Sequence, residues 1–206
     1  MSDGGVAARR SVTSARARIL DSAYELFSRY GIRAVGIDRI VERSGVAKMT
    51  LYRHFASKDE LVLAFLEERR RRWTRDWLQQ AIEEIAPDRP DRTLALFDVL
   101  DEWFHRPDYE GCSFIRTAHE IPDGPVHDQA VRQLEIVRRM LADHAAQAGV
   151  GDAEAFAYQM QILMMGAMAS ALRGDLEAAG RAREIAAGWL SNDPAVRAQR
   201  RPRTTT

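Results

Sequence analysis

Apolar residues recur at helical spacing along most of the chain, and no segment alternates convincingly in the manner of a β-strand. Residues 16–30 form the first clear example, with apolar side chains at i, i+4, i+7, i+8 and i+11, namely Ile19, Ala23, Leu26, Phe27 and Tyr30. This spacing predicts an amphipathic helix. Gly31 is well suited to end that helix in a left-handed conformation.

Two shorter helices are expected next, over residues 37–44 and 48–54, with Ser44-Gly45 as the break between them. At about 100° per residue, Leu51 and Phe55 fall on one side of the second of these helices, while Met49 and Arg53 fall opposite. The run from Ser57 to Glu60 has the form of a capping box, which predicts a further helix starting at Lys58.

The remaining chain also has a helical pattern, punctuated by proline and glycine. Helices are expected at about 58–85, 91–105, 113–120, 125–148, 152–172 and 175–191. The sequence therefore predicts an all-α protein of about nine helices. We expect four parts: a flexible arm at 1–13, a helix-turn-helix domain at 14–58, a larger helical domain at 59–191 and a disordered tail at 192–206.

The helix at 48–54 has the chemistry of a DNA recognition helix. One flank carries Lys48 and Tyr52, and the other carries Thr50 and His54. A short helix anchored by an apolar pair can enter a major groove, where its tip meets base edges and its flanks meet phosphates. The pattern therefore favours double-stranded DNA as a partner.

The first 60 residues or so resemble the DNA-binding domain of the tetracycline-repressor (TetR) family of bacterial transcription regulators. The resemblance rests on Gly31, Ser44-Gly45-Val46, Thr50-Leu51-Tyr52, His54-Phe55 and Lys58. It implies that residues matching Thr50, Tyr52, His54 and Lys58 hold the DNA backbone and that those matching Lys48, Met49 and Arg53 lie nearest the bases. The full candidate set is Lys48, Met49, Thr50, Tyr52, Arg53, His54, Lys58, Arg33 and Gly36.

Two residues depart from the family pattern. Gly36 and Ala47 stand where members of the family often have a hydroxyl side chain at the start of the second and third helices. Neither residue has a side-chain acceptor, although glycine is a tolerable N-cap. Water or a phosphate is then expected to satisfy the free N–H groups.

The formal net charge of zero conceals an uneven distribution. Residues 1–58 hold 11 lysine and arginine residues against 5 aspartate and glutamate residues, whereas the rest of the chain holds 19 against 25. Binding by the basic part releases counterions from DNA, so its affinity should fall steeply with salt. Whether Arg9 and Arg10 in the N-terminal arm reach a minor groove stays open.

The segment at 152–172 is apolar nearly all round, which a helix sustains when it is buried on two sides. One side should face its own domain, and the other needs a partner. With the helix that follows, it is expected to form a four-helix homodimer interface, as the resemblance also implies, through Met168, Ala169, Leu172, Ile185 and Trp189. A two-fold dimer requires an inverted-repeat operator with half-sites roughly 34 to 36 Å apart.

The resemblance also implies that the middle helices bind an effector. Ligand pockets are mostly apolar with a few polar groups, so the candidate lining is Trp77, Trp103, Phe104, Phe114, His119, Met140, Tyr158 and Met164. These residues are also consistent with an ordinary core. The favoured function is a repressor released by a small, largely apolar effector whose identity the sequence does not give.

The sequence favours other functions less. An activator or architectural regulator without an effector remains an alternative, whereas a helical enzyme is disfavoured because no catalytic motif is present. The spacing of Cys112 and the five histidines matches no metal site, so we expect no metal and no cofactor. A polar N-terminus and the lack of a long apolar run predict a cytoplasmic protein that does not enter a membrane.

Overall fold

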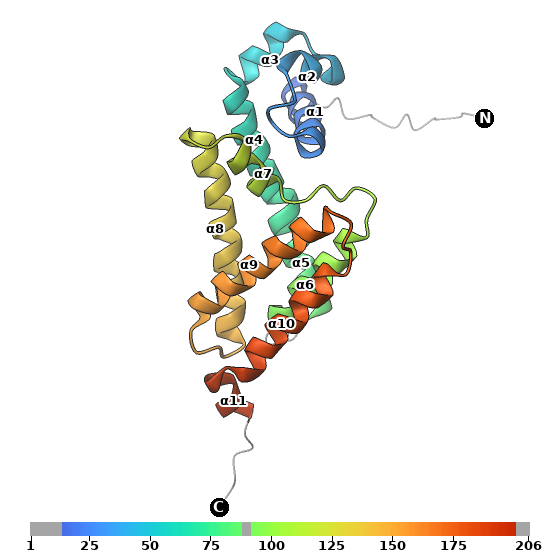
Figure 1. The fold of residues 1–206 in the computed structure, drawn as a ribbon. Helices are drawn as coiled ribbons and strands as arrows, with labels where there is room; N and C mark the ends of the chain where they lie inside the picture. The colour runs from blue at the N-terminus through green and yellow to red at the C-terminus, as the bar shows by residue number, and fades with distance from the viewer. Residues whose placement is uncertain (1–13, 88–91, 201–206) are drawn as a thin grey trace, which may run out of the picture. The chain divides into compact units, whose positions relative to one another are not determined.

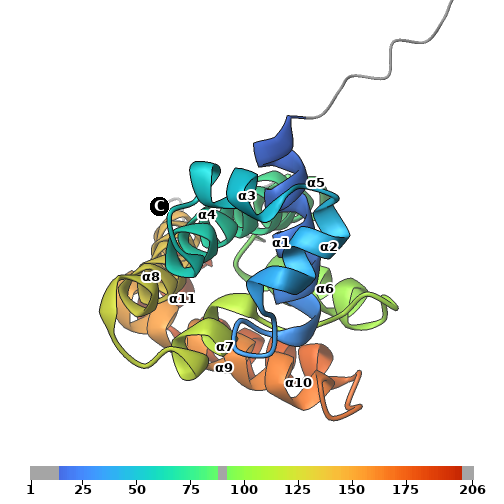
Figure 2. The same cartoon turned by 90° about the horizontal axis from the view of Figure 1, so that it is seen from above.

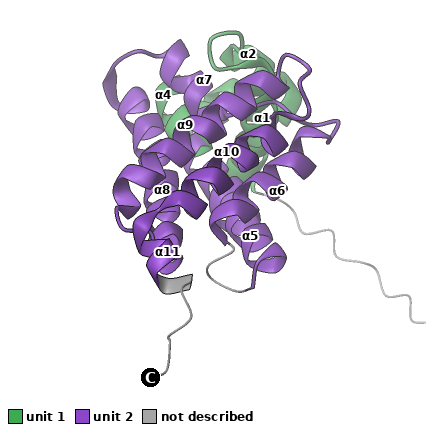
Figure 3. Ribbon diagram, turned by 60° about the horizontal axis from the view of Figure 1, so that its bottom comes forward, with its two compact units in different colours: residues 1–65 green, residues 66–206 purple. Residues whose placement is uncertain are grey.

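The computed structural model describes residues 14–87 and 92–200, and every regular element among them is helical (Figure 1). The chain divides into two compact units between Phe65 and Leu66 (Figure 3). We call residues 1–65 unit 1 and residues 66–206 unit 2. The sequence placed a domain boundary after Lys58, at the start of the helix in which the division lies. The predicted N-terminal arm at 1–13 lies outside the described residues.

Unit 1 contains α1 (Ala15–Tyr30), α2 (Ile37–Ser44), α3 (Lys48–His54) and the beginning of α4 (Lys58–Arg69). Ser14 caps α1 by accepting the N–H of Ala17 at 3.2 Å. Gly31 ends α1 with a φ of 84°, and Gly45 ends α2 with a φ of 62°. Both breaks follow the sequence prediction, because each needs a backbone conformation that glycine adopts at little cost.

The core of unit 1 joins three short helices that are too short to be stable alone. Helix α1 packs against α2 and α3, as the view in Figure 2 shows. Ile19, Ala23 and Ile40 are fully buried between these helices. The ring of Phe65 meets Phe27 edge-on at a centroid distance of 5.5 Å. The shape of α3 therefore depends on burial against α1.

Unit 2 is a bundle of longer helices. Helix α4 continues through a π-helical segment, η1 (Arg70–Gln79), into α5 (Gln80–Ile85). The others are α6 (Arg92–Phe104), α7 (Ser113–Glu120), α8 (Gly124–Gln147), α9 (Ala153–Ala171), α10 (Ala178–Asn192) and α11 (Pro194–Arg200). Helix α8 packs against α7 and α9, and α10 packs against α6 and α9 (Figure 1). The predicted helices are confirmed, within three residues at each end.

One prediction for the C-terminus is wrong, because residues 194–200 form α11 rather than a tail without structure. The carboxylate of Asp193 accepts the N–H groups of Ala195 and Val196 at 2.9 and 3.1 Å. Val196 is buried, with 4% of its surface exposed. The Asp193 cap, the burial of Val196 and the hydrogen bonds of Arg197 to Ser191 and Asn192 therefore accompany order in a segment of polar composition.

The π-helical winding of η1 is a second feature absent from the sequence prediction. The sequence predicted the extent of the long helix at 58–85. It did not predict the π segment, because a short π-helical stretch inside an α-helix does not change the spacing of apolar residues enough to be recognised. Within the described parts of the chain, no helix combines the length and the apolar content that crossing a bilayer requires.

Candidate nucleic-acid interface

Helix α3 is anchored on one side and open on the other. Leu51 and Phe55 are 0% and 1% exposed, whereas Met49 is 75% exposed. Tyr52 and Arg53 are exposed as well. The buried and exposed sides predicted from the helical spacing are thus confirmed. The side chains of Met49, Tyr52 and Arg53 are not part of the core of unit 1.

The helix starts in unit 1 lack side-chain caps, as their sequence predicts. Neither Gly36 before α2 nor Ala47 before α3 makes a side-chain capping bond. A Cβ placed on Gly36 meets nothing within 4 Å, so the start of α2 faces open space. Its first N–H groups are therefore accessible to an outside acceptor.

Lys48 has an internal partner that the sequence did not reveal. Its Nζ donates to Asp38 Oδ1 at 2.7 Å across the turn between α2 and α3. This hydrogen bond raises the pKa of Lys48. Both side chains are more than half exposed, so the pair lies at the surface. Spacing along one helix carries no signal for a contact between two helices.

Lys58 also serves the fold of unit 1. Its Nζ donates to the carbonyl oxygen of Ile32 at 2.6 Å and so ties the start of α4 to the loop after α1. The predicted cap is present, because Ser57 Oγ accepts the N–H of Glu60 at 3.1 Å. The Glu60 carboxylate accepts the N–H of Ala56 at 2.7 Å, one residue before the position that a capping box uses.

Three other arginine side chains of unit 1 lie near a hydroxyl group or over an aromatic ring. The guanidinium of Arg53 lies 3.4 Å from Thr50 Oγ1 on the same helix. Arg16 lies over the ring of Phe55 at 4.9 Å, and Arg39 lies over the ring of Tyr30 at 4.0 Å. His54 and Arg33 are exposed. Exposed arginine side chains are suited to neutralising phosphates.

In unit 2, part of the predicted effector lining gathers into an aromatic cluster, which we define as Trp73, Trp77, Trp103, Phe104 and Tyr109. Ring centroids in this cluster lie between 4.8 and 6.3 Å apart. Trp73 Nε1 and the neighbouring Thr74 Oγ1 are buried without a hydrogen-bond partner. Buried polar atoms are usually paired, so the cluster retains one unpaired donor, Trp73 Nε1.

The structure does not bring all eight predicted lining residues together. Phe114 and Met164 are buried in unit 2, at 2% and 1% exposure. His119 is exposed on α7, and Tyr158 is 56% exposed on α9, where Arg138 lies 4.5 Å over its ring. Met140 lines a separate, polar pocket. Periodicity identified apolar positions but not which of them face one another.

The predicted dimer residues also separate into two groups. Leu172, Ile185 and Trp189 are 55%, 47% and 38% exposed, and Ala169 is exposed between them in the sequence. Met168 is 2% exposed and is buried within its own chain, where its carbonyl accepts the Tyr109 hydroxyl at 2.7 Å. The assignment of Met168 to an intersubunit surface is therefore wrong.

Sequence reasoning missed Ile162 on this apolar surface. It is 68% exposed on α9, one helical turn after Tyr158. Because almost every position of α9 is apolar, its sequence pattern does not separate the inner face from the outer one.

Comparison with known proteins places these features in a family. Residues 19–65 match the sequence profile of the bacterial regulatory proteins of the tetR family. The transcriptional activator FasR of Mycolicibacterium smegmatis is 48% identical over 52 residues, which are 25% of this chain and 24% of FasR. The transcriptional repressor KstR2 of Mycobacterium tuberculosis is 37% identical over 75 residues, 36% of this chain and 35% of KstR2. These matches thus span well under half of either relative.

The similarity to solved structures extends over most of the chain. A crystal structure of a TetR-family transcriptional regulator from Streptomyces coelicolor has a TM-score of 0.78 and 31% sequence identity. The alignment covers 87% of this chain and 95% of that protein. A transcriptional regulator from Streptomyces avermitilis has a TM-score of 0.73 and 26% identity, over 84% of this chain and 98% of that one.

Proposed function

The chain belongs to the TetR family of DNA-binding transcriptional regulators, and on this premise we propose that it is a homodimeric repressor of an inverted-repeat operator. A small, largely apolar effector releases it from DNA. The family membership also removes the helical enzyme from consideration. The proposal places the protein in the bacterial cytoplasm, where it meets chromosomal DNA.

The observation that carries the DNA-binding proposal is the exposure of Met49 and Arg53 opposite the buried pair Leu51 and Phe55. In this proposal, α3 enters the major groove. Arg53 donates to a guanine edge, and Met49 contacts a thymine methyl group or another apolar base edge. Thr50, Tyr52 and His54 contact the flanking phosphates. The free N–H groups at the uncapped start of α2, after Gly36, donate to a further phosphate.

The homodimer rests on the exposed apolar side chains of α9 and α10. Tyr158, Ile162, Ile185 and Trp189 are all between 38% and 68% exposed. Monomers rarely leave such large apolar groups together in water. A second copy covers them in a two-fold arrangement, which holds two α3 helices at a separation matched to successive major-groove faces.

The proposed effector site rests on the aromatic cluster and its unpaired donor, Trp73 Nε1. An effector that inserts among the rings gains apolar contact, and an acceptor atom on it pairs with Trp73 Nε1. Release from DNA follows if the effector binds better to the form that holds DNA poorly. The π-helical segment η1 carries Trp73 and Trp77, so effector binding acts on the helix that leads into unit 1.

An activator is the second candidate, because the relative that is 48% identical over 52 residues bears the name of an activator. Both functions use the same DNA contacts. They differ in where the site lies relative to a promoter, and the amino-acid sequence does not encode that position.

Footprinting with purified protein on DNA upstream of its own and neighbouring genes tests the proposal. We expect a protected inverted repeat that overlaps a promoter, together with reduced transcription in a reconstituted assay. Protection upstream of the promoter with increased transcription would replace the repressor with the activator. The absence of any protected site would overturn the proposed operator binding.

A further inference from the structure

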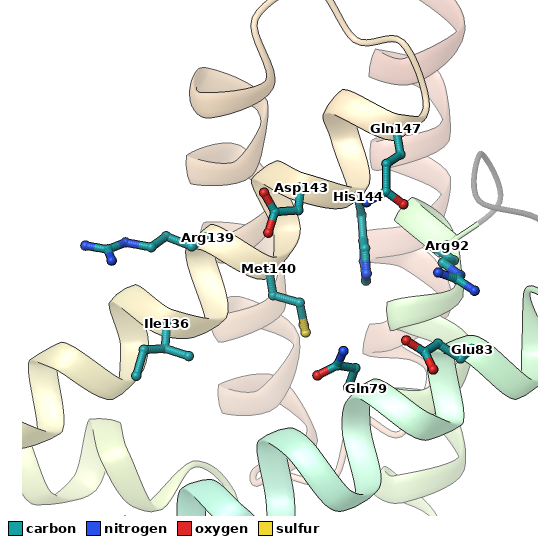
Figure 4. Close-up of a pocket in the computed structure, with 9 residues that line it drawn as sticks. All are labelled: Gln79, Glu83, Arg92, Ile136, Arg139, Met140, Asp143, His144 and Gln147. Atoms are coloured by element: carbon teal, nitrogen blue, oxygen red, sulfur yellow. The ribbon is translucent and has the colours of Figure 1, made fainter.

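A pocket of about 320 Å³ lies within unit 2, between the η1–α5 segment, α6 and α8. It shares no residue with the aromatic cluster. Figure 4 shows the side chains that line it, among them Glu83, Arg92, Met140, Asp143 and His144. The volume falls at the lower end of the roughly 300 to 1,000 Å³ typical of small-molecule sites.

His144 forms the buried part of this pocket. Its side chain is 6% exposed, and its Nδ1 has no hydrogen-bond partner. Burial lowers the pKa of His144, and the nearby cation of Arg92 lowers it further. The ring is therefore neutral near pH 7, and a neutral imidazole carries one acceptor nitrogen. His144 lines the pocket, and its Nδ1 lacks the hydrogen-bond partner that buried polar atoms usually have.

Two carboxylates line the same pocket. Glu83 on α5 and Asp143 on α8 are exposed, and neither forms an ion pair with any residue that the structure describes. The negative charges of both carboxylates favour the protonated form of His144, so both charges are felt at the imidazole ring. They lie on different helices, and the pocket is between those helices (Figure 4).

Of the two cations that line the pocket, Arg92 lies near His144 and Arg139 points away from the other lining residues. Arg92 donates to the carbonyl oxygens of Ala86 and Pro87 at 3.0 and 3.3 Å. Arg139 pairs with Glu135 at 3.3 Å, and in Figure 4 its guanidinium extends away from the other lining residues. The negative charge of the pocket is therefore only partly balanced.

We propose that this pocket binds a small organic molecule that carries a primary ammonium group. An ammonium has three N–H donors and no acceptor. The pocket offers it the carboxylates of Glu83 and Asp143 and the imidazole of His144 as acceptors. Bonds between charged partners are stronger than neutral ones. Met140 and Ile136 provide apolar surface for the carbon chain of the ligand.

A metal ion is the other kind of cation that carboxylate and imidazole groups bind. Among the residues that the structure describes, no three histidine, cysteine, aspartate or glutamate side chains are close enough to hold one. An organic cation needs looser geometry, because its hydrogen bonds reach farther than metal–ligand bonds. The observations therefore favour the ammonium.

Calorimetric titration of the full-length protein without DNA tests the proposal. The probes are butylammonium, the uncharged butan-1-ol and the oppositely charged butyrate. We expect saturable binding of butylammonium alone. Glu83→Gln and Asp143→Asn should each weaken it by about ten-fold or more, because each removes one charge-assisted hydrogen bond. Glu84→Gln, an exposed neighbour outside the pocket, should leave it unchanged.

His144 is tested with His144→Gln, which keeps an acceptor, and His144→Leu, which does not. A circular dichroism melt first establishes that each variant is folded. Binding should survive better in the glutamine variant. Preferential binding of butyrate would instead identify an anion site at Arg92 and overturn the proposal. So would unchanged affinity in both carboxylate variants, or no butylammonium binding to the folded protein at about 10 mM, a weak affinity even for so small a ligand. Because no DNA is present, these outcomes are independent of operator binding.

Discussion

Helix α3 and helix α9 both expose apolar side chains, but they do so in opposite chemical settings. Met49 on α3 is exposed among Lys48, Tyr52 and Arg53. Ile162 on α9 is exposed on a helix whose only charged residue is Glu154. A basic helix attracts a polyanion, whereas an uncharged one gains more from burial against another apolar surface. Exposure alone does not identify a partner; the charge around the exposed residue does.

The two surfaces also differ in what supports them. Helix α3 has seven residues and depends on Leu51 and Phe55 being buried by α1. Helix α9 has 19 residues and packs against both α8 and α10. A change on the buried side of α3 should therefore disturb the whole surface, while a change on the exposed side of α9 should leave the fold intact.

The largest expected effect is that of Leu51→Ala. The truncation should destabilise unit 1 by about 2 to 5 kcal/mol, because it leaves a cavity at a fully buried position. Hydrogen exchange of the α1–α3 amides measures this loss. All four tryptophans lie in unit 2, so tryptophan fluorescence reports on the other unit and should change little. The matched control, Met49→Ala, removes an exposed side chain from the same helix, and equal destabilisation by both would contradict the anchored side of α3.

The next effect concerns the apolar surface of α9. Ile162→Glu places a charge in the proposed dimer interface and should weaken dimerisation by about 2 kcal/mol or more, as expected at an interface hot spot. Sedimentation velocity at several concentrations measures it. The control is Val131→Glu, at a 45% exposed apolar residue on α8. If both variants remain dimeric at wild-type concentrations, the second copy does not bind at α9.

A smaller effect is expected from Arg53→Ala on α3. Loss of a base-edge contact should cost about 1 to 3 kcal/mol on the operator and relax sequence preference at one position. Gel-shift titrations on operator and random DNA measure the difference. Arg29→Ala removes the same charge from α1 and serves as the control. Equal losses on both DNAs in the Arg53 variant would show that Arg53 contacts a phosphate rather than a base.

The smallest effect is expected from Asp38→Asn. Asp38 engages Lys48 at 2.7 Å in the free protein, so its removal should leave the Lys48 charge available to DNA. The salt dependence of binding should steepen by up to about 0.9 in the slope of log K against log salt, for operator and random DNA alike. Glu42→Gln on the same helix controls for the loss of an acidic residue. A slope that stays at its wild-type value would mean that Lys48 does not contact DNA phosphates.

The sequence predicted the helices of unit 1 well, because their signals are local. The glycine breaks at Gly31 and Gly45, the cap at Ser57 and the apolar pair on α3 each depend on residues within one or two turns. The same local signals led to the recognition-helix surface. They did not predict the roles of Asp38 and Ile32, since those residues meet Lys48 and Lys58 across loops.

The prediction was weaker for unit 2. The helix positions there followed from periodicity, but Met168 was assigned to the wrong face and Tyr158 and His119 to an interior. In helices that are apolar on most sides, the pattern no longer distinguishes core from surface. The polar pocket at His144 joins residues of the η1–α5 segment and the start of α6 to residues of α8, more than 40 positions later, so no sequence motif predicts it.

The sequence by itself determined the all-helical class, the family and the two sides of α3, because hydrophobic spacing and short capping motifs act within a single helix. Tertiary structure alone decided which cations have partners, which apolar side chains of α9 and α10 reach the surface, and where Glu83, Asp143 and His144 gather. These features depend on how the helices pack against one another. Contacts between segments that are distant in sequence do not appear in the spacing of apolar residues along the chain.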